Sequence, residues 1–153
     1  MEIERLDHLE PEEFAAEVES LVLESEQEGF NMLRRLADDF ESGANRFDLQ
    51  GEALFGCYNK GKLIAIGGLN IDPFEVDPFV GRVRRLYVSP ACRRRGVGGL
   101  LMDMIRAQAR SEGFRELRLR TDTVEAAAFY ERIGFEPTPA SEAATHRIVV
   151  DSE

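Results

Sequence analysis

Three arginines and three glycines gather in one short segment, Arg93-Arg94-Arg95-Gly96-Val97-Gly98-Gly99. Guanidinium groups present forked N–H donors that match phosphate oxygens, and glycine lets a main chain come close to a ligand. The segment leads into an apolar stretch of helical periodicity, so its last residues would supply the free N–H groups of a helix N-terminus, which attract anions. The pattern therefore predicts a cradle for a pyrophosphate group.

Two better-known phosphate loops are excluded by the residues around this segment. A Walker loop needs Gly-Lys followed by Ser or Thr, which is absent. A dinucleotide fingerprint needs a third glycine and a strand that leads straight into the first. Here Leu101 holds the third position, and residues 89–95 intervene. The remaining alternative to a cradle is a solvated arginine-rich loop in front of a helix.

Charge is distributed unevenly along the chain. The formal net charge is −10, which argues against general nucleic-acid binding. Residues 1–53 carry 16 acids and 4 bases, whereas residues 82–122 carry 11 arginines and 4 acids. Either the two parts pair on the surface, or the basic segment is an anion site; the sequence leaves both open.

Cysteine chemistry and membrane insertion are not expected. Cys57 and Cys92 are too few for a disulfide framework, and their spacing matches no zinc site, so no metal is predicted. Cys92 has no motif-adjacent histidine that would activate it as a nucleophile. The longest apolar run, residues 63–69, is far shorter than a membrane span, and the first 30 residues do not resemble a signal peptide. A reducing cytoplasm is the expected compartment.

The elements that must position the arginine–glycine segment follow from hydrophobic periodicity. Length and composition fit one globular domain, residues 1–153. In helix 97–110 the side chains of Leu100, Leu101, Met104 and Ile105 are expected to face inward. Predicted strands are 3–6, 53–58, 63–69, 82–88, 117–120, 135–138 and 145–150, and predicted helices begin at Pro11 and span 29–40, 97–110 and 125–133. Strands alternating with helices inside a mixed sheet indicate an α/β or α+β fold.

Three blocks in this order resemble the GNAT superfamily of acyl-CoA-dependent N-acetyltransferases, over about residues 82–135. The first block is the strand 83–88 followed by Ser89-Pro90, and the second is the Arg/Gln-x-x-Gly-x-Gly/Ala signature at Arg93, Gly96 and Gly98. The third block resembles the pattern Asn-x-x-Ala-x-x-Leu/Phe-Tyr followed by Gly-Phe, with Thr123 where Asn is common. Its matching residues are Ala126, Phe129, Tyr130, Gly134 and Phe135.

The resemblance implies a mixed, largely antiparallel sheet of about six to seven strands with about four helices, and strands that splay around an acyl-CoA site. It implies acetyl-CoA as co-substrate, with the pyrophosphate held by main-chain amides of residues 94–99. The pantetheine arm would pair with the main chain of Leu86 and Val88, as an added strand does. The residues expected to bind the co-substrate are Leu86, Tyr87, Val88, Arg93, Arg94, Arg95, Gly96, Val97, Gly98, Gly99, Thr123, Ala126 and Phe129.

Tyr130 is the expected catalytic residue. The family places a tyrosine here, near the CoA sulfur, and a phenol remains protonated at neutral pH and can donate to a departing thiolate. The alternative is a core tyrosine on the apolar face of its helix, beside Phe129 and Ile133.

The general base is left open. Many family members carry a Glu near the start of the strand, where this chain has Arg82. Ordered water or His146, whose ordinary pKa suits the task, could take the amine proton instead. Further carboxylates that could act through water are Glu52, Asp72, Glu75, Asp77 and Asp122.

The function implied is transfer of an acetyl group to a primary amine, of a small molecule or a peptide, by direct attack on the thioester. The acidic residues 1–53 favour a cationic amine. Arg82 and Arg84, which share a strand face, favour an amine that carries a carboxylate. The alternative function is a non-catalytic acyl-CoA-binding regulatory module on the same fold. Homodimerisation is common in domains of this size.

Overall fold

One mixed sheet runs through the whole molecule, in the strand order β1-β2-β3-β4-β5-β7-β6. The structure, a computed structural model, describes residues 1–139 and 143–151. All neighbouring strands pair antiparallel except β4 and β5, which are parallel. The strands are β1 (Glu2–Arg5), β2 (Ala53–Asn59), β3 (Lys62–Ile71), β4 (Val80–Val88), β5 (Glu116–Leu119), β6 (Glu136–Pro137) and β7 (His146–Val149). The expected mixed, largely antiparallel sheet is confirmed, and it does not close on itself.

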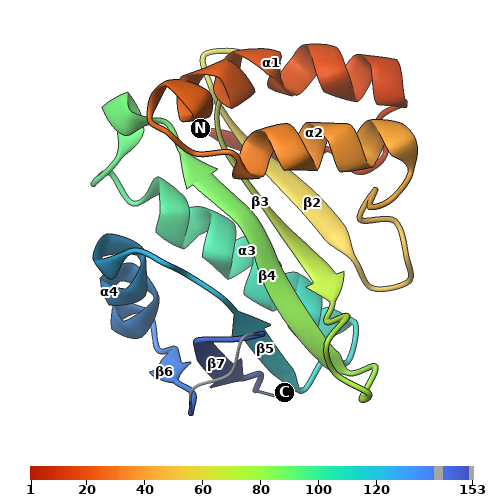
Figure 1. Ribbon diagram of the computed structural model, residues 1–153, viewed down its shortest axis with the longest axis vertical. Helices are drawn as coiled ribbons and strands as arrows, with labels where there is room; N and C mark the ends of the chain where they lie inside the picture. The colour runs from red at the N-terminus through yellow and green to blue at the C-terminus, as the bar shows by residue number, and fades with distance from the viewer. Residues whose placement is uncertain (140–142, 152–153) are drawn as a thin grey trace.

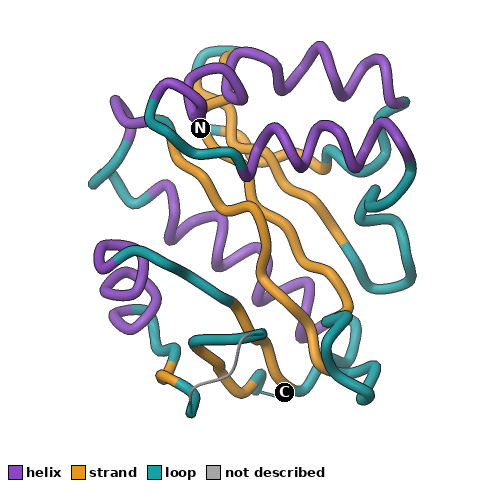
Figure 2. Tube along the Cα trace, viewed as in Figure 1, coloured by secondary structure: helices purple, strands orange, loops and turns teal. Residues whose placement is uncertain are grey.

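Four α-helices cover the sheet in the described part of the chain (Figures 1 and 2). They are α1 (Pro11–Gln27), α2 (Met32–Ser42), α3 (Val97–Ser111) and α4 (Val124–Arg132), and a 3₁₀ turn (Pro90–Cys92) follows β4. No helix within residues 1–139 and 143–151 is long and apolar enough to cross a membrane.

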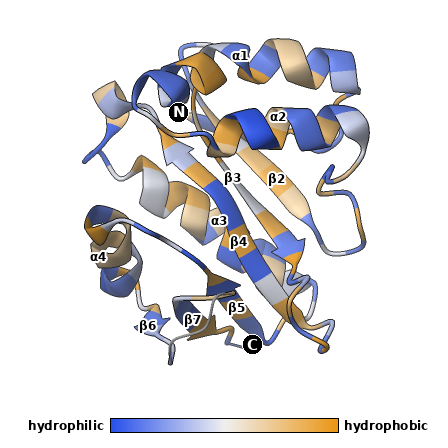
Figure 3. Cartoon of the chain, viewed as in Figure 1, coloured by the Kyte–Doolittle hydropathy of each residue, from blue (hydrophilic) through white to orange (hydrophobic). Residues whose placement is uncertain are grey.

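Two apolar cores lie on opposite faces of the sheet. On one face α1 and α2 pack together, with the rings of Phe14 and Phe40 stacked at 3.8 Å. On the other face α3 and α4 pack on the central strands through residues such as Leu101, Ile105 and Tyr130. Figure 3 shows β2 hydrophobic along its length, whereas polar and apolar residues alternate along β4. This alternation places different side chains of β4 in front of α2 and α3.

The inward face of α3 is narrower than its sequence predicts. Leu101 and Ile105 are fully buried as expected, whereas Leu100 and Met104 are each 38% exposed. The buried stripe follows Val97, Leu101, Ile105 and Ala109, with Met102 beside it. The expectation for Leu100 and Met104 was wrong because these residues lie one position outside the i, i+4 stripe that contacts the sheet.

Strands β4 and β5 pair only at their beginnings. Val80, Gly81 and Arg82 pair with Glu116, Leu117 and Arg118, and no later residue of β4 pairs with β5. Figure 1 shows β5 beside only the lower end of the long strand β4. The predicted splay is therefore confirmed, and it leaves the second half of β4 with an unpaired edge.

A β-bulge bends β4 where this unpaired edge begins. The register passes from Gly68 opposite Arg84 to Ile66 opposite Tyr87, so two residues of β4 face the single Gly67. Arg85 takes the left-handed conformation, with φ +61°. A Cβ atom on Gly67 would lie 2.8 Å from Leu86 Cδ1, so a larger residue at this position would have to displace the Leu86 side chain.

Candidate functional site

The arginine–glycine segment forms the turn that starts α3. Arg94 and Gly96 both have positive φ, +64° and +79°, and Gly96 caps the helix. The first main-chain bond of the helix is Leu100 N to Gly96 O, at 3.0 Å. Among the described residues, the N–H groups of Val97, Gly98 and Gly99 have no acceptor. These free donors, at the positive end of the helix dipole, form the arrangement that binds phosphate oxygens.

The third sequence block lies against this turn. A Cβ atom on Gly98 would lie 3.2 Å from the ring of Phe129 on α4 and 3.7 Å from Val88 Cγ2. Thr123 caps α4, because its Oγ1 accepts from Ala126 N at 3.1 Å. The structure thus brings the end of β4, the start of α3 and helix α4 together.

Arg93 does not point its guanidinium into this turn. It makes a two-pronged ion pair with Glu28, at 2.9 and 2.6 Å, and its Nε donates to Val88 O at 2.9 Å. Glu28 also accepts from the Tyr87 hydroxyl at 2.5 Å, and the guanidinium lies 5.4 Å from that ring. Arg93 lowers the pKa of the Glu28 carboxyl. Arg94 and Arg95 are exposed and form no ion pair with a described residue.

Glu28 contributes to the site by holding Arg93, and the sequence did not reveal this role. It lies at the end of α1, 65 residues before Arg93, and no local pattern connects the two. Within the described residues, Arg93–Glu28 is also the only ion pair that joins the acidic residues 1–53 to the basic residues 82–122. Surface pairing of the two parts therefore explains little of the charge split.

The unpaired edge of β4 has its last polar groups at Val88. Ser89 N donates to Ile64 O at 2.8 Å, and Tyr87 pairs with Ile66, so both face β3. Successive residues of a strand point to opposite edges, so the main-chain groups of Val88 face away from β3. Val88 O is occupied by Arg93, which leaves Val88 N–H as the free group, whereas the main chain of Tyr87 is committed to β3.

Tyr130 is buried, 8% exposed, between the rings of Phe129 and Phe135 at 5.2 and 5.5 Å. Burial raises the pKa of its phenol, so it is a neutral donor throughout the neutral and mildly alkaline range. The hydroxyl makes no hydrogen bond within residues 1–139 and 143–151. Arg147 Nε is the one fully buried side-chain polar atom without a partner there, so the unpaired Tyr130 hydroxyl must reach solvent. A buried phenol with a free, reachable hydroxyl can donate to a ligand.

Each carboxylate that could serve as a base already has a partner. Glu52 accepts from Leu49 N, Asn70 Nδ2 and Ile71 N. The other pairs are Asp72 with Arg82, Glu75 with Arg118, Asp77 with Arg115, and Asp122 with Arg120. The pKa of Asp77 is lowered by the Phe79 N–H and by Arg115.

His146 is held between two side chains. Its Nε2 lies 2.8 Å from Glu131 Oε2, and its Nδ1 lies 2.8 Å from Thr145 Oγ1. It is opposite Leu119 in the β5–β7 ladder and so shares the α3 face of the sheet with this core residue. Both ring nitrogens are occupied, which supports a role in fixing β7 against α4.

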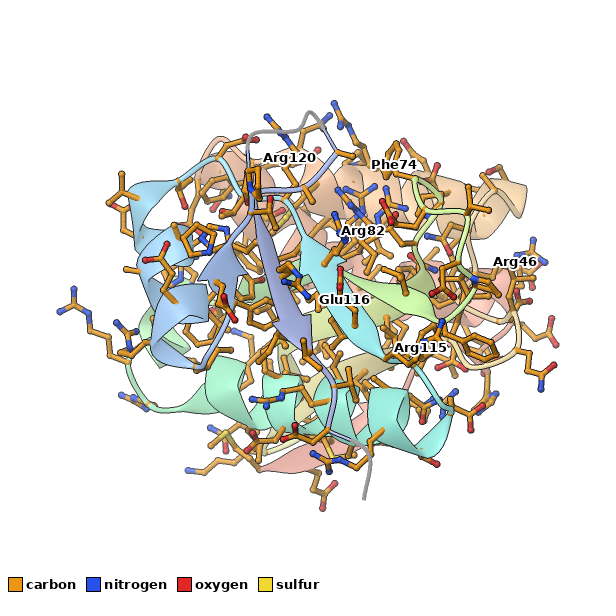
Figure 4. The ribbon with its side chains drawn as sticks, turned by 90° about the horizontal axis from the view of Figure 1, so that it is seen from below. Arg46, Phe74, Arg82, Arg115, Glu116 and Arg120 are labelled. Atoms are coloured by element: carbon orange, nitrogen blue, oxygen red, sulfur yellow. The ribbon has the colours of Figure 1, made fainter. Side chains whose placement is uncertain are left out.

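Arg82 occupies the position where a family glutamate is common, and it is enclosed. Its Nη1 lies 3.3 Å from Asp72 Oδ2, its Nη2 donates to Ala143 O, and Phe74 stacks on it at 4.8 Å. Figure 4 shows Arg82 between Phe74 and Arg120. Arg84 follows on the same face of β4. Both side chains therefore lie opposite the α3 core, on the face that carries α2.

Metal-binding groups and cysteines were also considered as candidate sites among the described residues. Within residues 1–139 and 143–151 no group of three His, Cys, Asp or Glu residues could hold a metal ion. Cys57 is buried, and burial raises the pKa of its thiol.

The chain also resembles known proteins in sequence and in fold. The chain matches the model of the acetyltransferase (GNAT) family over residues 8–135, whereas no curated protein matches it. A solved structure from Exiguobacterium sp. 255-15, assigned as an acetyltransferase, is 26% identical over 97% of this chain and 92% of that one, with a TM-score of 0.79.

Two more distant structures share the fold. A GNAT-family acetyltransferase from Staphylococcus aureus Mu50 is 15% identical over 98% of this chain and 100% of its own, with a TM-score of 0.73. The PaiA N-acetyltransferase of Thermoplasma acidophilum, solved in complex with coenzyme A, is 16% identical over 96% and 98%, with a TM-score of 0.63.

Proposed function

Because the chain belongs to the acetyltransferase (GNAT) family and is thus an acyltransferase that uses acetyl-CoA, we propose that its acceptor is a primary amine. The amine nitrogen attacks the thioester carbon directly, and no acyl-enzyme forms. The observation that carries this proposal is the unpaired edge of β4, which ends beside the free N–H groups that start α3.

The co-substrate fits these residues from its two ends. Pyrophosphate oxygens accept from the main chain of residues 94–99, and Arg94 and Arg95 add positive charge. The pantetheine arm lies along the open edge of β4. Val88 N–H supplies a main-chain donor there, and the main chain of Leu86, at the bulge, lies next to it on the same edge. Thr123, Ala126 and Phe129 support this site through α4, and Arg93 supports it through Val88 O.

The bulge and Tyr130 act on the reacting atoms. A bulge leaves a main-chain N–H of the extra residue outside the ladder. We propose that this N–H donates to the thioester oxygen, where negative charge develops during attack. When the carbon–sulfur bond breaks, the Tyr130 hydroxyl gives its proton to the sulfur and CoA leaves as the thiol; the phenolate then regains a proton from solvent, which its hydroxyl reaches. The proton lost by the amine passes to water, because Arg82 replaces a carboxylate base and the neighbouring Asp72 is already paired.

Arg82 is also the observation that favours a second candidate, a module on the same fold that binds acyl-CoA without catalysis. The two candidates differ in one measurable property, which is the release of thiol when an amine is added. Retention of an unpaired, buried Tyr130 hydroxyl supports the enzyme. We treat residues 1–153 as one domain, as the continuous sheet supports, and place it in the cytoplasm, where the unpaired Cys57 and Cys92 would remain reduced.

The test combines binding and turnover on the same protein. Acetyl-CoA and CoA at about 100 times their Kd should each stabilise the fold by about 2.7 kcal/mol in thermal unfolding, and ATP should stabilise it less. Thiol release is then followed spectrophotometrically against a panel of amines. Stabilisation with thiol release supports the enzyme, stabilisation without release on every amine supports the binding module, and no stabilisation by acetyl-CoA would refute the cradle.

A further inference from the structure

Two arginines at the bulge of β4 have no partner among the described residues. Arg84 and Arg85 are half-buried, yet neither makes a hydrogen bond or an ion pair within 4.0 Å to any residue of the described ranges. Their neighbour Arg82, by contrast, is fully engaged by Asp72, Ala143 O and Phe74. Burial of a charged group without a partner is unfavourable, and guanidinium groups in such positions bind oxyanions.

The surroundings of these two side chains are rich in positive charge. Burial lowers the pKa of Arg85, and so do the positive charges of Arg84, Arg35 and Arg82, against which Asp39 is the one opposing carboxylate. Asp39 is half-buried on α2 and does not come within ion-pairing distance of Arg85. Asp39 therefore offsets the charge of Arg85 only in part, and no carboxylate of the described residues forms an ion pair with either guanidinium group.

A cavity of about 250 Å³ opens beside Arg84. Asn45, Asn70 and Arg46 line it together with the carboxylates Asp48 and Glu52. Glu52 is already saturated by Leu49 N, Asn70 Nδ2 and Ile71 N, and Asp48 is exposed. The amides of Asn45 and Asn70 are hydrogen-bonded to each other, at 2.9 and 3.0 Å. The Arg84 guanidinium, which pairs with no described residue, is thus the group that the cavity offers to a small anionic molecule.

The acidic residues 1–53 contribute Asp7, Asp48 and Glu52 to a second cavity, of about 390 Å³, which Arg5 and Glu112 also line. Glutamates of α1 such as Glu12, Glu13 and Glu19 lie on its exposed face, whereas its buried face is apolar. Their charge reaches solvent and not the bulge. In the second cavity Asp7 already pairs with Arg5, and Glu52 accepts three hydrogen bonds. Because Arg84 and Arg85 have no such partner among the described residues, we favour the acceptor that carries an anionic group over the cationic one.

We propose that the amine acceptor of this enzyme carries an oxyanion, a carboxylate or a phosphate, that binds Arg84 and Arg85 on the α2 side of β4. This inference rests on the proposed transfer to an amine, and it adds the substrate class. Arg84 and Arg85 directly precede Leu86, where the open edge of β4 begins. An acceptor anchored there holds its amine next to the thioester.

The test measures binding without turnover. The protein is saturated with CoA, which has no acetyl group to transfer, and two matched pairs of amines are titrated by calorimetry. The pairs are β-alanine with β-alaninamide, and O-phosphoethanolamine with ethanolamine. The anionic member of at least one pair should bind at least about tenfold more tightly, or about 1.4 kcal/mol, and the pair that discriminates identifies carboxylate or phosphate.

Variants assign the preference to the two side chains. Arg84→Gln and Arg85→Gln should each reduce it to less than about threefold, and Arg85→Gly checks the second result without left-handed strain. Arg110→Gln is the matched control, because Arg110 is exposed on α3 and, among the residues that the structure describes, its guanidinium donates to Asp151 O alone. Unchanged stabilisation by acetyl-CoA shows that each variant is folded.

The outcomes separate this inference from the proposed function. Equal affinity within both pairs, or a preference that survives in both the Arg84 and Arg85 variants, overturns the anionic acceptor. Discrimination by the CoA complex without thiol release from acetyl-CoA would support the anion site and refute amine acetylation. Thiol release with ethanolamine, without discrimination in binding, would support amine acetylation and refute the anion site.

Discussion

Replacing Tyr130 with phenylalanine separates the phenol hydroxyl from the rest of the side chain. The ring packs between Phe129 and Phe135, and phenylalanine keeps those contacts. The hydroxyl has no hydrogen-bond partner in the described structure, so its removal orphans no protein group. The free energy of unfolding should therefore change by no more than about 0.5 kcal/mol.

Turnover should respond in the opposite way. If the hydroxyl donates to the departing sulfur, Tyr130→Phe lowers kcat about tenfold or more, which is at least about 1.4 kcal/mol of transition-state stabilisation. Affinity for acetyl-CoA should change little. Because burial raises the pKa of the phenol, the wild-type kcat should not fall through ionisation of Tyr130 below about pH 10.

Tyr58→Phe provides the matched control, since Tyr58 on β2 is also 8% exposed. Its hydroxyl donates to Glu17, so its loss should reduce stability by about 1–2 kcal/mol while kcat is retained. Steady-state thiol release and urea unfolding on both variants give the comparison. A Tyr130→Phe enzyme with wild-type kcat, or a fall in kcat shared by both variants, would refute the catalytic assignment.

Three further changes test the supports of the site. Gly96→Ala places a Cβ at φ +79° and should lower stability by about 1 kcal/mol and weaken acetyl-CoA binding, as thermal-shift titration will show; unchanged affinity would contradict the cradle. Because Arg93 lowers the pKa of Glu28, this pair stabilises the fold above the ordinary carboxyl pKa and is lost as the pH falls below it. Wild type should then lose more stability than Glu28→Gln between about pH 5 and pH 3 in urea unfolding; equal losses would oppose this. Asp72→Ala leaves the buried Arg82 unpaired and should destabilise by about 3 kcal/mol, which the same unfolding assay measures against Asp122→Ala, an exposed partner of Arg120.

Most helices and strands of the fold could be predicted from local sequence patterns. Residues 59–62, Asn-Lys-Gly-Lys, are a turn-forming sequence between the predicted strands 53–58 and 63–69, and in the structure Lys60 and Gly61 take positive φ, 52° and 79°. Gly43 and Gly134 follow the ends of α2 and α4 and have positive φ, the conformation in which glycine commonly ends a helix. Helices and strands of this kind are set by residues that are neighbours in the chain, so periodicity and turn chemistry suffice.

The features that shape the site depend on register and on distant pairing, which periodicity does not encode. The bulge at Arg85 exists because of how β4 is aligned with β3, and its one trace in the sequence is the pair Gly67-Gly68, since glycine inside a strand often marks a bulge. Glu28 meets Arg93 only after the chain has folded. For the same reason the sequence could not decide whether Arg84 faced a partner.

The identity of the base has a consequence for the pH dependence of turnover. Arg82 cannot accept a proton, and Asp72 accepts from both Arg82 and Phe74 N, so within residues 1–139 and 143–151 no free carboxylate replaces the missing glutamate there. If water takes the proton, the acceptor must deprotonate at its own pKa, and the acidic limb of kcat/KM should follow the acceptor.

Two acceptors that both carry a carboxylate make this measurable. The α-amine of a dipeptide such as glycylglycine has a pKa of about 8, and an alkyl amine such as that of β-alanine has a pKa of about 10. The acidic limbs of their kcat/KM profiles should therefore lie about two pH units apart. Coincident limbs would mean that one group of the enzyme takes the proton from both amines, and the base would then have to be sought among the carboxylates around Arg82 and at His146.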